Sequence, residues 1–526
     1  MNKKILLCFI LLIFNVVLMS ACGAPAAQPA VPAVTAPDEP VAIIVEAEGA
    51  SGRTDLNLVT PFVLGSADPM ADTSINGRRI LWNVFESLIH VDDRGNVEMR
   101  IAESYELADD NRTYTFNLRN DVQFHNGDML RASDIVFSLE RARTMPLMYR
   151  FIVLVESFRA IDNYTVEIVS VEPMAMFLFN LSQIRMVSER AVTEAGAAAF
   201  LSAETSLSGT GPFYFTEFDP ATYIRMAAFP YYYRGKASIL TVTYRHVADP
   251  TTALVGFQAG EFDFVTIPHA NIEEVIRAGE ANVHLNPTAH ASFIRLNINQ
   301  YPLDNRLVRQ AIAYAICNDE VLLGSLSGFG DVSENLAREG FIFGATTDGV
   351  PLFRHNPERA RELLAEAGYQ DGVDIGIINA IAGTYFARAA EIIQQHLSDV
   401  GITVAVQALE VSLVVERVFF GQEFDMAFHG DNLLVDSDNV YRLFFSPDAV
   451  TTMPNHNPRI VELGELAGRT LDPEERLEIY REFWQVVQYE ASILSLFHRN
   501  NAFATDPALN IVLDTSFYWL YDWSWQ

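Results

Sequence analysis

The chain has 526 residues, half of them apolar and a fifth charged, which is typical of a globular protein with two or three domains. Its formal net charge of −31 argues against nucleic-acid binding, because phosphate contacts need clustered lysine and arginine. Lysine is almost absent: after Lys3 and Lys4 only Lys236 follows, and no phosphate-binding loop sequence surrounds it. Lysine-centred catalysis is therefore excluded.

The N-terminus has the pattern of a bacterial export signal. Two lysines precede an apolar run, and the following LMSACG resembles a lipobox, in which the cysteine receives lipid. We expect residues 1–21 to be a lipoprotein signal peptide and Cys22 to be the lipidation site. The alternatives are a plain signal peptide or an uncleaved anchor, for which the apolar run is short. Residues 22–52, rich in Ala and Pro, are predicted to form an extended tether.

Residues 102–143 give the first specific structural prediction. Apolar and polar residues alternate from Thr113 to Arg119, which is typical of a half-buried strand. His125–Asp128 is a turn signal, in which Gly127 can take a positive φ. Ile135, Leu139 and Ala142 then share one face of a predicted helix, and Ser133 is expected to supply its capping hydroxyl.

This stretch resembles the signature of the extracellular solute-binding protein family 5 of ABC transporters, the class that binds peptides, oligopeptides and nickel. The family pattern LRxxVxFHxG corresponds to LRNDVQFHNG at 118–127, and its helix ADVVFSLxRA is matched by DIVFSLER at 134–141. Further family-like stretches follow in the family's order. They are GTGPFYF at 209–215, FPYYYRGK at 229–236, ALVGFQAGEFDF at 253–264, LDNRLVRQAIAYAI at 303–316 and NPERARELLAEAGY at 356–369. The resemblance covers nearly everything from Asp55 to the C-terminus.

The resemblance implies an α/β, two-lobed fold like that of periplasmic binding proteins of class II, with an extra subdomain and two crossovers between the lobes. Alternating strand and helix signals agree with α/β lobes. We place the crossovers near Pro287 and near Leu494. The predicted first lobe comprises residues 53–88, 195–288 and 495–526, its extra subdomain residues 89–194, and the second lobe residues 289–494.

The resemblance also implies a ligand cleft between the lobes, and residues 425–439 carry its strongest candidates. In peptide-binding relatives an Asp of this loop takes the ammonium group of the ligand. When the loops are aligned on 436–439, that Asp falls on Leu433 of this chain. The ammonium anchor is therefore either displaced to Asp431 or missing.

His429, Asn432 and Asp436 complete the ligand-binding candidates of this loop. Alternatively, Asp431 and Asp436 cap turns, as aspartates in loops commonly do. His429 with Asp431 also suggests metal ligation, but no third ligand follows at a suitable spacing, so we predict no metal and no cofactor.

Four other residues are weaker ligand-binding candidates. Tyr385 aligns with a position that lines the cleft, although a buried core tyrosine fits equally well. Phe497 and His498 lie at the second crossover and face the cleft in relatives. Met70 follows a turn of the family type and is expected at the rim of the first lobe.

These features predict a substrate-binding protein of an ABC importer and not an enzyme. It would be a monomer on the outer face of the membrane, held by lipid, that captures a peptide or similar small solute for a permease. Nickel chelates, opines and oligosaccharides are alternative ligands, and a sensor built on the same fold is an alternative role. A secreted hydrolase is disfavoured, because the chain has no GxSxG or HExxH sequence.

Overall fold

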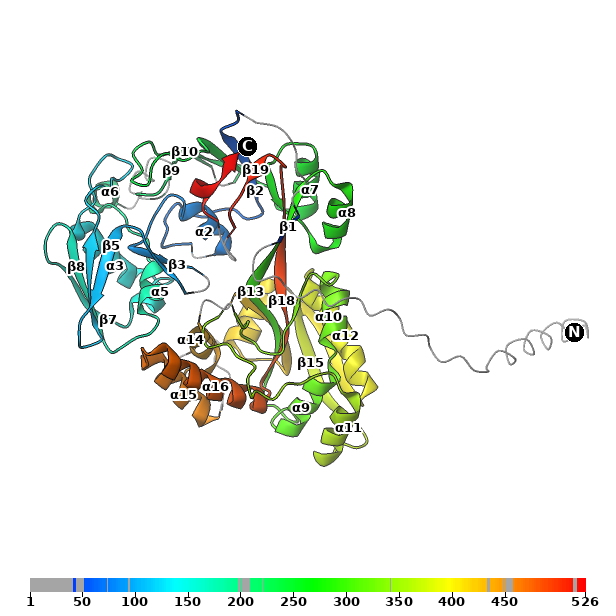
Figure 1. The fold of residues 1–526 in the computed structure, drawn as a ribbon. Coiled ribbons are helices and arrows are strands. Elements are labelled where there is room, and N and C mark those ends of the chain that lie inside the picture. The colour runs from blue at the N-terminus through cyan, green and yellow to red at the C-terminus, as the bar shows by residue number, and fades with distance from the viewer. Residues whose placement is uncertain are drawn as a thin grey trace, which may run out of the picture. The chain divides into compact units, whose positions relative to one another are not determined.

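The computed structural model describes residues 41–43, 52–72, 74–92, 95–196, 200, 209–219, 221–340, 342–432, 436–447, 449, 457–513 and 518–526 (Figure 1). Cys22 and most of the predicted tether lie outside these residues. Within the described ranges, no helix combines the length and the apolar character that a membrane crossing needs.

A twelve-stranded mixed sheet runs through the described chain. Neighbouring strands follow in the order β16 (Ile402–Leu409), β15 (Val373–Ile381), β17 (Met426–Asn432), β13 (Asn282–Leu296), β18 (Ile493–Thr505), β12 (Phe264–Thr266), β2 (Asp55–Thr60), β11 (Thr241–His246), β10 (Tyr223–Ala228) and β9 (Phe213–Asp219). Two short strands join off this path, β1 (Val41–Ile43) on β13 and β14 (Gly330–Val332) on β18. Parallel pairs such as β15 with β16 and β2 with β11 confirm the predicted α/β class.

The two longest strands, β13 and β18, form the centre of this sheet (Figure 1). They are antiparallel from Asn282 opposite Thr505 to Arg295 opposite Ile493. Strands of the predicted first lobe continue from one end of the pair, and strands of the predicted second lobe continue from the other. Pro287, where we expected one crossover, lies within β13 and pairs with Asn500, so the chain passes between the two strand groups on these two strands.

Residues 102–170 form a separate four-stranded sheet in the order β5 (Ala102–Leu107), β6 (Thr113–Leu118), β8 (Thr165–Ser170) and β7 (Val155–Ala160). The predicted strand is β6, and the predicted helix is α3 (Ala132–Thr144), which buries Ile135, Leu139 and Ala142. Gly127 in the turn between them has φ +92°, as the sequence indicated. This part of the chain is therefore folded as predicted.

The cap of α3 differs from the prediction. Arg131 is the N-cap residue, and its backbone N–H donates to Oδ2 of Asp134 over 2.9 Å. The other carboxylate oxygen of Asp134 accepts from the N–H of Glu189, also at 2.9 Å. A carboxylate at the third helical position thus performs the capping that we had expected of Ser133, and it joins α3 to the helix that begins at Glu189.

The remaining elements cover the sheets and complete separate apolar cores on either side of the β13–β18 pair. On the first-lobe side they are α2 (Ile75–Leu81), β3 (Ile89–Val91), β4 (Val97–Met99), α4 (Tyr149–Ile152), α5 (Phe177–Ser182), α6 (Glu189–Ala195), α7 (Pro250–Gln258), η3 (His269–Asn271), α8 (Ile272–Ala278), β19 (Leu509–Asn510), η6 (Leu520–Asp522) and β20 (Ser524–Trp525). On the second-lobe side they are α9 (Arg306–Ala315), α10 (Asn318–Leu326), α11 (Pro357–Glu366), α12 (Tyr385–Asp399), α13 (Val411–Leu413), η4 (Val414–Phe420), α14 (Ser437–Val440), η5 (Tyr441–Phe445), α15 (Pro458–Arg469) and α16 (Pro473–Glu490).

The subdomain and the second-lobe segment also touch far from β13 and β18. The backbone N–H of Ala175 donates to the carbonyl oxygen of Gly468 over 3.1 Å. Beside it, Nε of Arg469 lies 2.8 Å from Oε2 of Glu172. The C-terminal end of α15 is therefore joined directly to the loop that precedes α5.

A buried ion pair fixes the segment that begins at Asp436. Both oxygens of Asp436 accept from Arg476 of α16, with Nη2 to Oδ1 at 2.8 Å, and the hydroxyl of Tyr480 donates to Oδ1 over 3.0 Å. Asp436 also caps α14, accepting from the N–H of Asp438 at 2.8 Å. These contacts engage the carboxylate within the protein, which agrees with the alternative that Asp436 is a capping residue.

We expect Asp436→Asn to lower the free energy of unfolding by about 3 kcal/mol, because the guanidinium of Arg476 would stay buried without its counter-ion. Urea unfolding at neutral pH measures this. Glu478→Gln is the matched control on the same helix, since it removes a carboxylate from an exposed pair with Arg481. Equal stability of Asp436→Asn and the control would contradict the structural role of the buried pair.

Candidate functional site

Several of the predicted site residues come together where β13, β17, β18 and α12 meet. Tyr385 is the first residue of α12, and its hydroxyl lies 3.0 Å from Oγ of Ser292 on β13. Its ring centroid is 6.1 Å from that of Phe497 on β18. Phe497 is completely buried there, within the apolar core of the second-lobe side.

The end of β17 lies beside the same position. β17 runs antiparallel to β13, with Asp431 opposite Ala291 and Asn432 opposite His290. The structure describes the backbone of Asp431 and Asn432 but not their side chains. The ammonium anchor expected at Asp431 therefore stays a prediction; its backbone pairs with Ala291 of β13, which pairs in turn with His498 of β18.

His429, two residues earlier, is packed between aromatic rings. Its imidazole stacks on Phe293 with centroids 4.8 Å apart, and it meets Phe444 edge-on at 5.5 Å. The side chain is nearly buried. Among the described side chains, no three His, Cys, Asp or Glu residues lie close enough together to hold a metal ion.

Two other candidates lie away from this meeting point. Met70 was expected at a rim, but it is fully buried in the core of the subdomain side with Leu88 and Phe116. Its backbone N–H donates to Asp68 over 2.9 Å, so the turn that contains it folds inward. Asp436 belongs to the buried ion pair with Arg476.

His498 lies on the opposite face of β18 from Phe497, because successive side chains of a strand alternate. Its Nε2 is 2.9 Å from Oγ of Ser333. Burial first, and then the positive charge of Arg338, lowers the pKa of His498 to about 3. The imidazole is therefore neutral over the whole physiological range.

Residues that the sequence did not single out complete the meeting point. Residues 288–290 form a bulge in β13 opposite Arg499, and the hydroxyl of Thr288 donates to the carbonyl oxygen of Arg499 over 2.5 Å. His290 in this bulge has a pKa well below its ordinary value, because it is buried and because Arg499 is nearby. Burial raises the pKa of Tyr385, an effect that Arg499 opposes.

Arg79 reaches the same region from α2. Its guanidinium lies over the rings of Phe503, at 5.7 Å, and Tyr518, at 5.5 Å. Burial lowers the pKa of Arg79, and the positive charge of Arg499 lowers it further. We call Arg79, His290, Tyr385 and Arg499 the arginine cluster. Tyr385 is its only member that the sequence pattern predicted.

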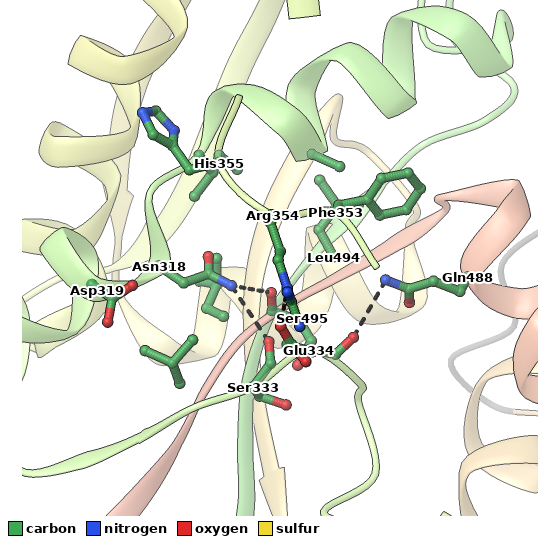
Figure 2. A pocket seen from close by; sticks show the side chains of 14 residues that line it. Asn318, Asp319, Ser333, Glu334, Phe353, Arg354, His355, Gln488, Leu494 and Ser495 are labelled. Carbon is green, nitrogen blue, oxygen red and sulfur yellow. Dashed lines mark hydrogen bonds and ion pairs between the residues drawn. The ribbon is translucent and has the colours of Figure 1, made fainter. Parts of the chain in front are cut away.

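A separate cavity of about 240 Å³ lies on the second-lobe side, between β14, β18 and the start of α10 (Figure 2). Asn318 donates to the carbonyl oxygens of Ser333 and Ser495, at 3.4 and 3.2 Å, and Arg354 pairs with Glu334 over 2.9 Å. Its polar groups thus bond mainly to one another. None of the predicted ligand-binding residues lines it.

The sequence of residues 96–452 matches the family described as bacterial extracellular solute-binding proteins, family 5 Middle. The chain belongs to this family. Family 5 proteins are substrate-binding proteins of ABC transporters that act outside the cytoplasm, so this protein is a transport protein and not an enzyme.

Curated relatives of this family 5 protein are moderately similar in sequence. The chain is 26% identical over 432 residues to the dipeptide-binding protein of Escherichia coli, covering 76% of this chain and 80% of that protein. It is also 26% identical over 352 residues to the glutathione-binding protein GsiB of Pectobacterium atrosepticum, covering 66% and 67%.

Solved structures confirm the fold. NikA from Brucella suis in complex with Fe(III)-EDTA superposes with a TM-score of 0.81 at 22% identity, over 90% of this chain and 100% of that one. DppA from Helicobacter pylori in complex with the peptide STSA superposes with a TM-score of 0.75 at 22% identity, over 90% and 98%. The predicted periplasmic-binding-protein-like fold is therefore confirmed.

The buried His498 predicts how stability depends on pH. Because its folded pKa of about 3 lies below the value near 6.5 of an unfolded histidine, the unfolded chain binds the extra proton first, and stability falls as the pH drops below 6.5. Between pH 6.5 and 4.5 this contribution is on the order of 2 kcal/mol. We expect His498→Gln, which keeps a hydrogen-bond donor for Ser333, to reduce the loss by about that amount.

Urea unfolding at several pH values measures this difference. His355→Gln, which changes an exposed histidine, is the control. If both variants reduced the acid sensitivity equally, the effect would not come from the burial of His498.

Proposed function

We propose that the protein captures a small solute, a peptide or a molecule of similar size, between two lobes that meet at β13 and β18, and delivers it to an ABC permease. The observation that carries this proposal is the meeting of Tyr385, Phe497 and the end of β17 on these two strands. Its relatives include a dipeptide-binding and a glutathione-binding protein, which supports a peptide-like ligand. Closing two lobes around a ligand would remove it from water while a few polar groups fix its orientation.

The proposed lobe boundaries are those expected from the sequence, with the first lobe in residues 53–88, 195–288 and 495–526 and the second in 289–494. The antiparallel pairing of β13 and β18 supports a hinge there, because within the described residues these two strands carry the main chain between the two strand groups. The bulge at 288–290 supports the same place, since it interrupts the ladder of hydrogen bonds.

For the site itself, we propose that Asp431 and Asn432 at the end of β17 contact the ligand together with Tyr385. His429 and Phe497 would support them from behind through ring packing, while His498 would support β18 from its other face. Asp436 would act indirectly, by fixing the start of α14 through its pair with Arg476. We propose no ligand contact for Met70, which is buried elsewhere.

Mass spectrometry of the solute that co-purifies with the protein tests the proposed function directly. With that solute, Asp431→Ala is expected to abolish the ligand-induced rise in melting temperature, because a ligand's ammonium group would lose its counter-ion. Glu391→Ala, which removes an exposed carboxylate from α12, is the matched control and should keep the full rise. An unchanged rise in Asp431→Ala would exclude Asp431 as an anchor.

We further propose that Cys22 is lipidated and that the stretch predicted at residues 22–52 tethers a monomeric binding protein to the outer face of the membrane, although Val41–Ile43 within it pair with β13 as strand β1. The lipobox-like LMSACG and the Ala- and Pro-rich stretch after it support this. Anchoring by acyl chains requires the cysteine that carries them.

Cys22→Ser should therefore move the protein from the membrane fraction to the soluble fraction of the producing cells. Fractionation followed by immunoblotting measures the distribution. The control is Cys317→Ser, which should stay with the membrane. Retention of Cys22→Ser in the membrane fraction would refute lipidation at this position.

A further inference from the structure

The cavity on the second-lobe side is enclosed by elements of that side alone. Its walls come from the end of α9, the start of α10, the residues that follow β14, the segment 353–355, the end of α16 and the start of β18. An engineered protein cavity of about 150 Å³ holds benzene. The 240 Å³ of this cavity therefore has room for a ring with a short side chain.

The inner part of the cavity is apolar. The apolar residues that line it are Ala313, Ile316, Val332, Phe353, Leu494 and Leu496. Of these, Leu494 and Leu496 are almost completely buried and lie on one face of β18, because side chains of a strand alternate. A compact apolar molecule would be removed from water against this surface, which is favourable.

The unused hydrogen-bonding atoms of the polar lining are acceptors. Asn318 donates through its side-chain nitrogen to two backbone carbonyl oxygens, and its Oδ1 has no described partner. Gln488 is only 8% exposed, and its Nε2 donates to the carbonyl oxygen of Glu334 over 3.4 Å. Its Oε1 likewise accepts no hydrogen bond from a described group. A ligand that completes these bonds has to be a donor.

The solvent-exposed side of the cavity, which we call the mouth, carries more negative than positive charge. Asp319 lies there and forms no ion pair with any described side chain, and Glu334 pairs with Arg354. The neighbouring Glu320 binds His396 over 2.9 Å, and Nδ1 of His355 lies 3.1 Å from the carbonyl oxygen of Ala315. Carboxylates in the first turn of α10 oppose an anion at this helix start and favour a cation.

The pair between Glu334 and Arg354 spans the mouth. Figure 2 shows the side chain of Arg354 reaching Glu334, with Asp319 on one side and Gln488 on the other. The two paired side chains are 37% and 77% exposed, and ion pairs with such exposure are weak. A ligand cation could therefore replace the guanidinium of Arg354 beside Glu334 at little cost.

We propose that this cavity binds an organic ammonium ion with a compact apolar body. The body lies against Leu494 and Leu496, and the ammonium group faces Asp319 and Glu334. The carboxylate of an amino acid would meet the same acidic mouth, so the site prefers amines that lack one. This inference goes beyond the proposed function, because the site is separate from the junction of β13, β17 and α12 where capture is proposed.

Three probes with the same apolar body test the site through melting temperatures at neutral pH and constant ionic strength. 2-Phenylethylamine, which is protonated there, should raise the melting temperature of the wild-type protein. The uncharged 2-phenylethanol should give a smaller rise, and the anionic 3-phenylpropionate should give none. No rise with the amine would overturn the site, and equal rises with the amine and the alcohol would overturn the recognition of an ammonium group.

Two substitutions at the mouth should have opposite effects. Asp319→Asn should weaken binding of 2-phenylethylamine by about threefold to fivefold, as expected for an ion pair near solvent. Arg354→Gln should strengthen it by a similar factor, because Glu334 loses its competing partner. Asp371→Asn is the matched control at an exposed position outside the cavity and should bind the amine like the wild type. Equal affinities of Asp319→Asn and the control, or weaker binding by Arg354→Gln, would contradict the proposal.

Two further variants locate the bound amine. Ala313→Leu places a larger side chain in the cavity and should abolish binding, so unchanged binding would overturn the site. Asp431 is the ammonium anchor proposed for capture, and the amine has to be distinguished from a ligand there. Loss of the rise in Asp431→Ala together with a full rise in Asp319→Asn would place the amine at the capture site and overturn the assignment to the cavity. Circular dichroism of each variant confirms that it is folded.

Discussion

The antiparallel pairing of β13 with β18 is the constraint on which the rest of the structure depends. Its two ends belong to different strand groups, so the register from Asn282 opposite Thr505 to Arg295 opposite Ile493 positions both groups. The ladder is interrupted at two places, at the bulge of residues 288–290 and between Ser292 and Phe293, and at the first of them side chains bridge the two strands. Thr288 donates to the carbonyl oxygen of Arg499, and Arg338 donates to that of Thr288 over 2.9 Å. The central pair is therefore continuous enough to align the two halves and irregular enough to bend.

The net charge of the chain does not describe the electrostatic surroundings of its candidate site. A charge of −31 concerns the solvated surface, where most carboxylates lie and where salt screens their field. Around Arg499 the described titratable neighbours include Arg79, His290 and Tyr385, and β14 lies beside it, with Gly330 opposite Arg499 and Asp331 opposite His498. Since charges interact far more strongly when water is excluded, a few buried groups outweigh many exposed ones in deciding which solutes are accepted. Under the proposed capture, local burial and not the overall charge would set which solutes the site prefers.

The sequence predicted the fold well and the site only in part, for a physical reason. The strand, turn and helix at 113–142 depend on neighbours along the chain, and local periodicity sufficed to predict them. Even there the predicted capping residue of α3, Ser133, was wrong. Asp134 caps the helix instead, and it also bonds to Glu189, which is distant in sequence. Met70 and Asp436 were chosen by alignment, but tertiary packing buries one and pairs the other with Arg476. Arg79 and Arg499 are 420 positions apart and influence each other only through the fold, so no pattern in the sequence distinguishes them from other arginines.

The contact between α15 and the loop before α5 affects the conformational equilibrium of the protein when no ligand is bound. Rotation about β13 and β18, the motion that the proposed capture needs, has to separate Ala175 from Gly468 and Glu172 from Arg469. An ion pair whose side chains are 55% and 36% exposed contributes about 0–1 kcal/mol, and one backbone hydrogen bond adds about 1 kcal/mol. A ligand of micromolar affinity contributes about 8 kcal/mol. These two contacts between α15 and the loop before α5 therefore bias the conformational equilibrium of the ligand-free protein only slightly. The permease could then distinguish loaded from ligand-free receptors by how long the two contacts stay formed.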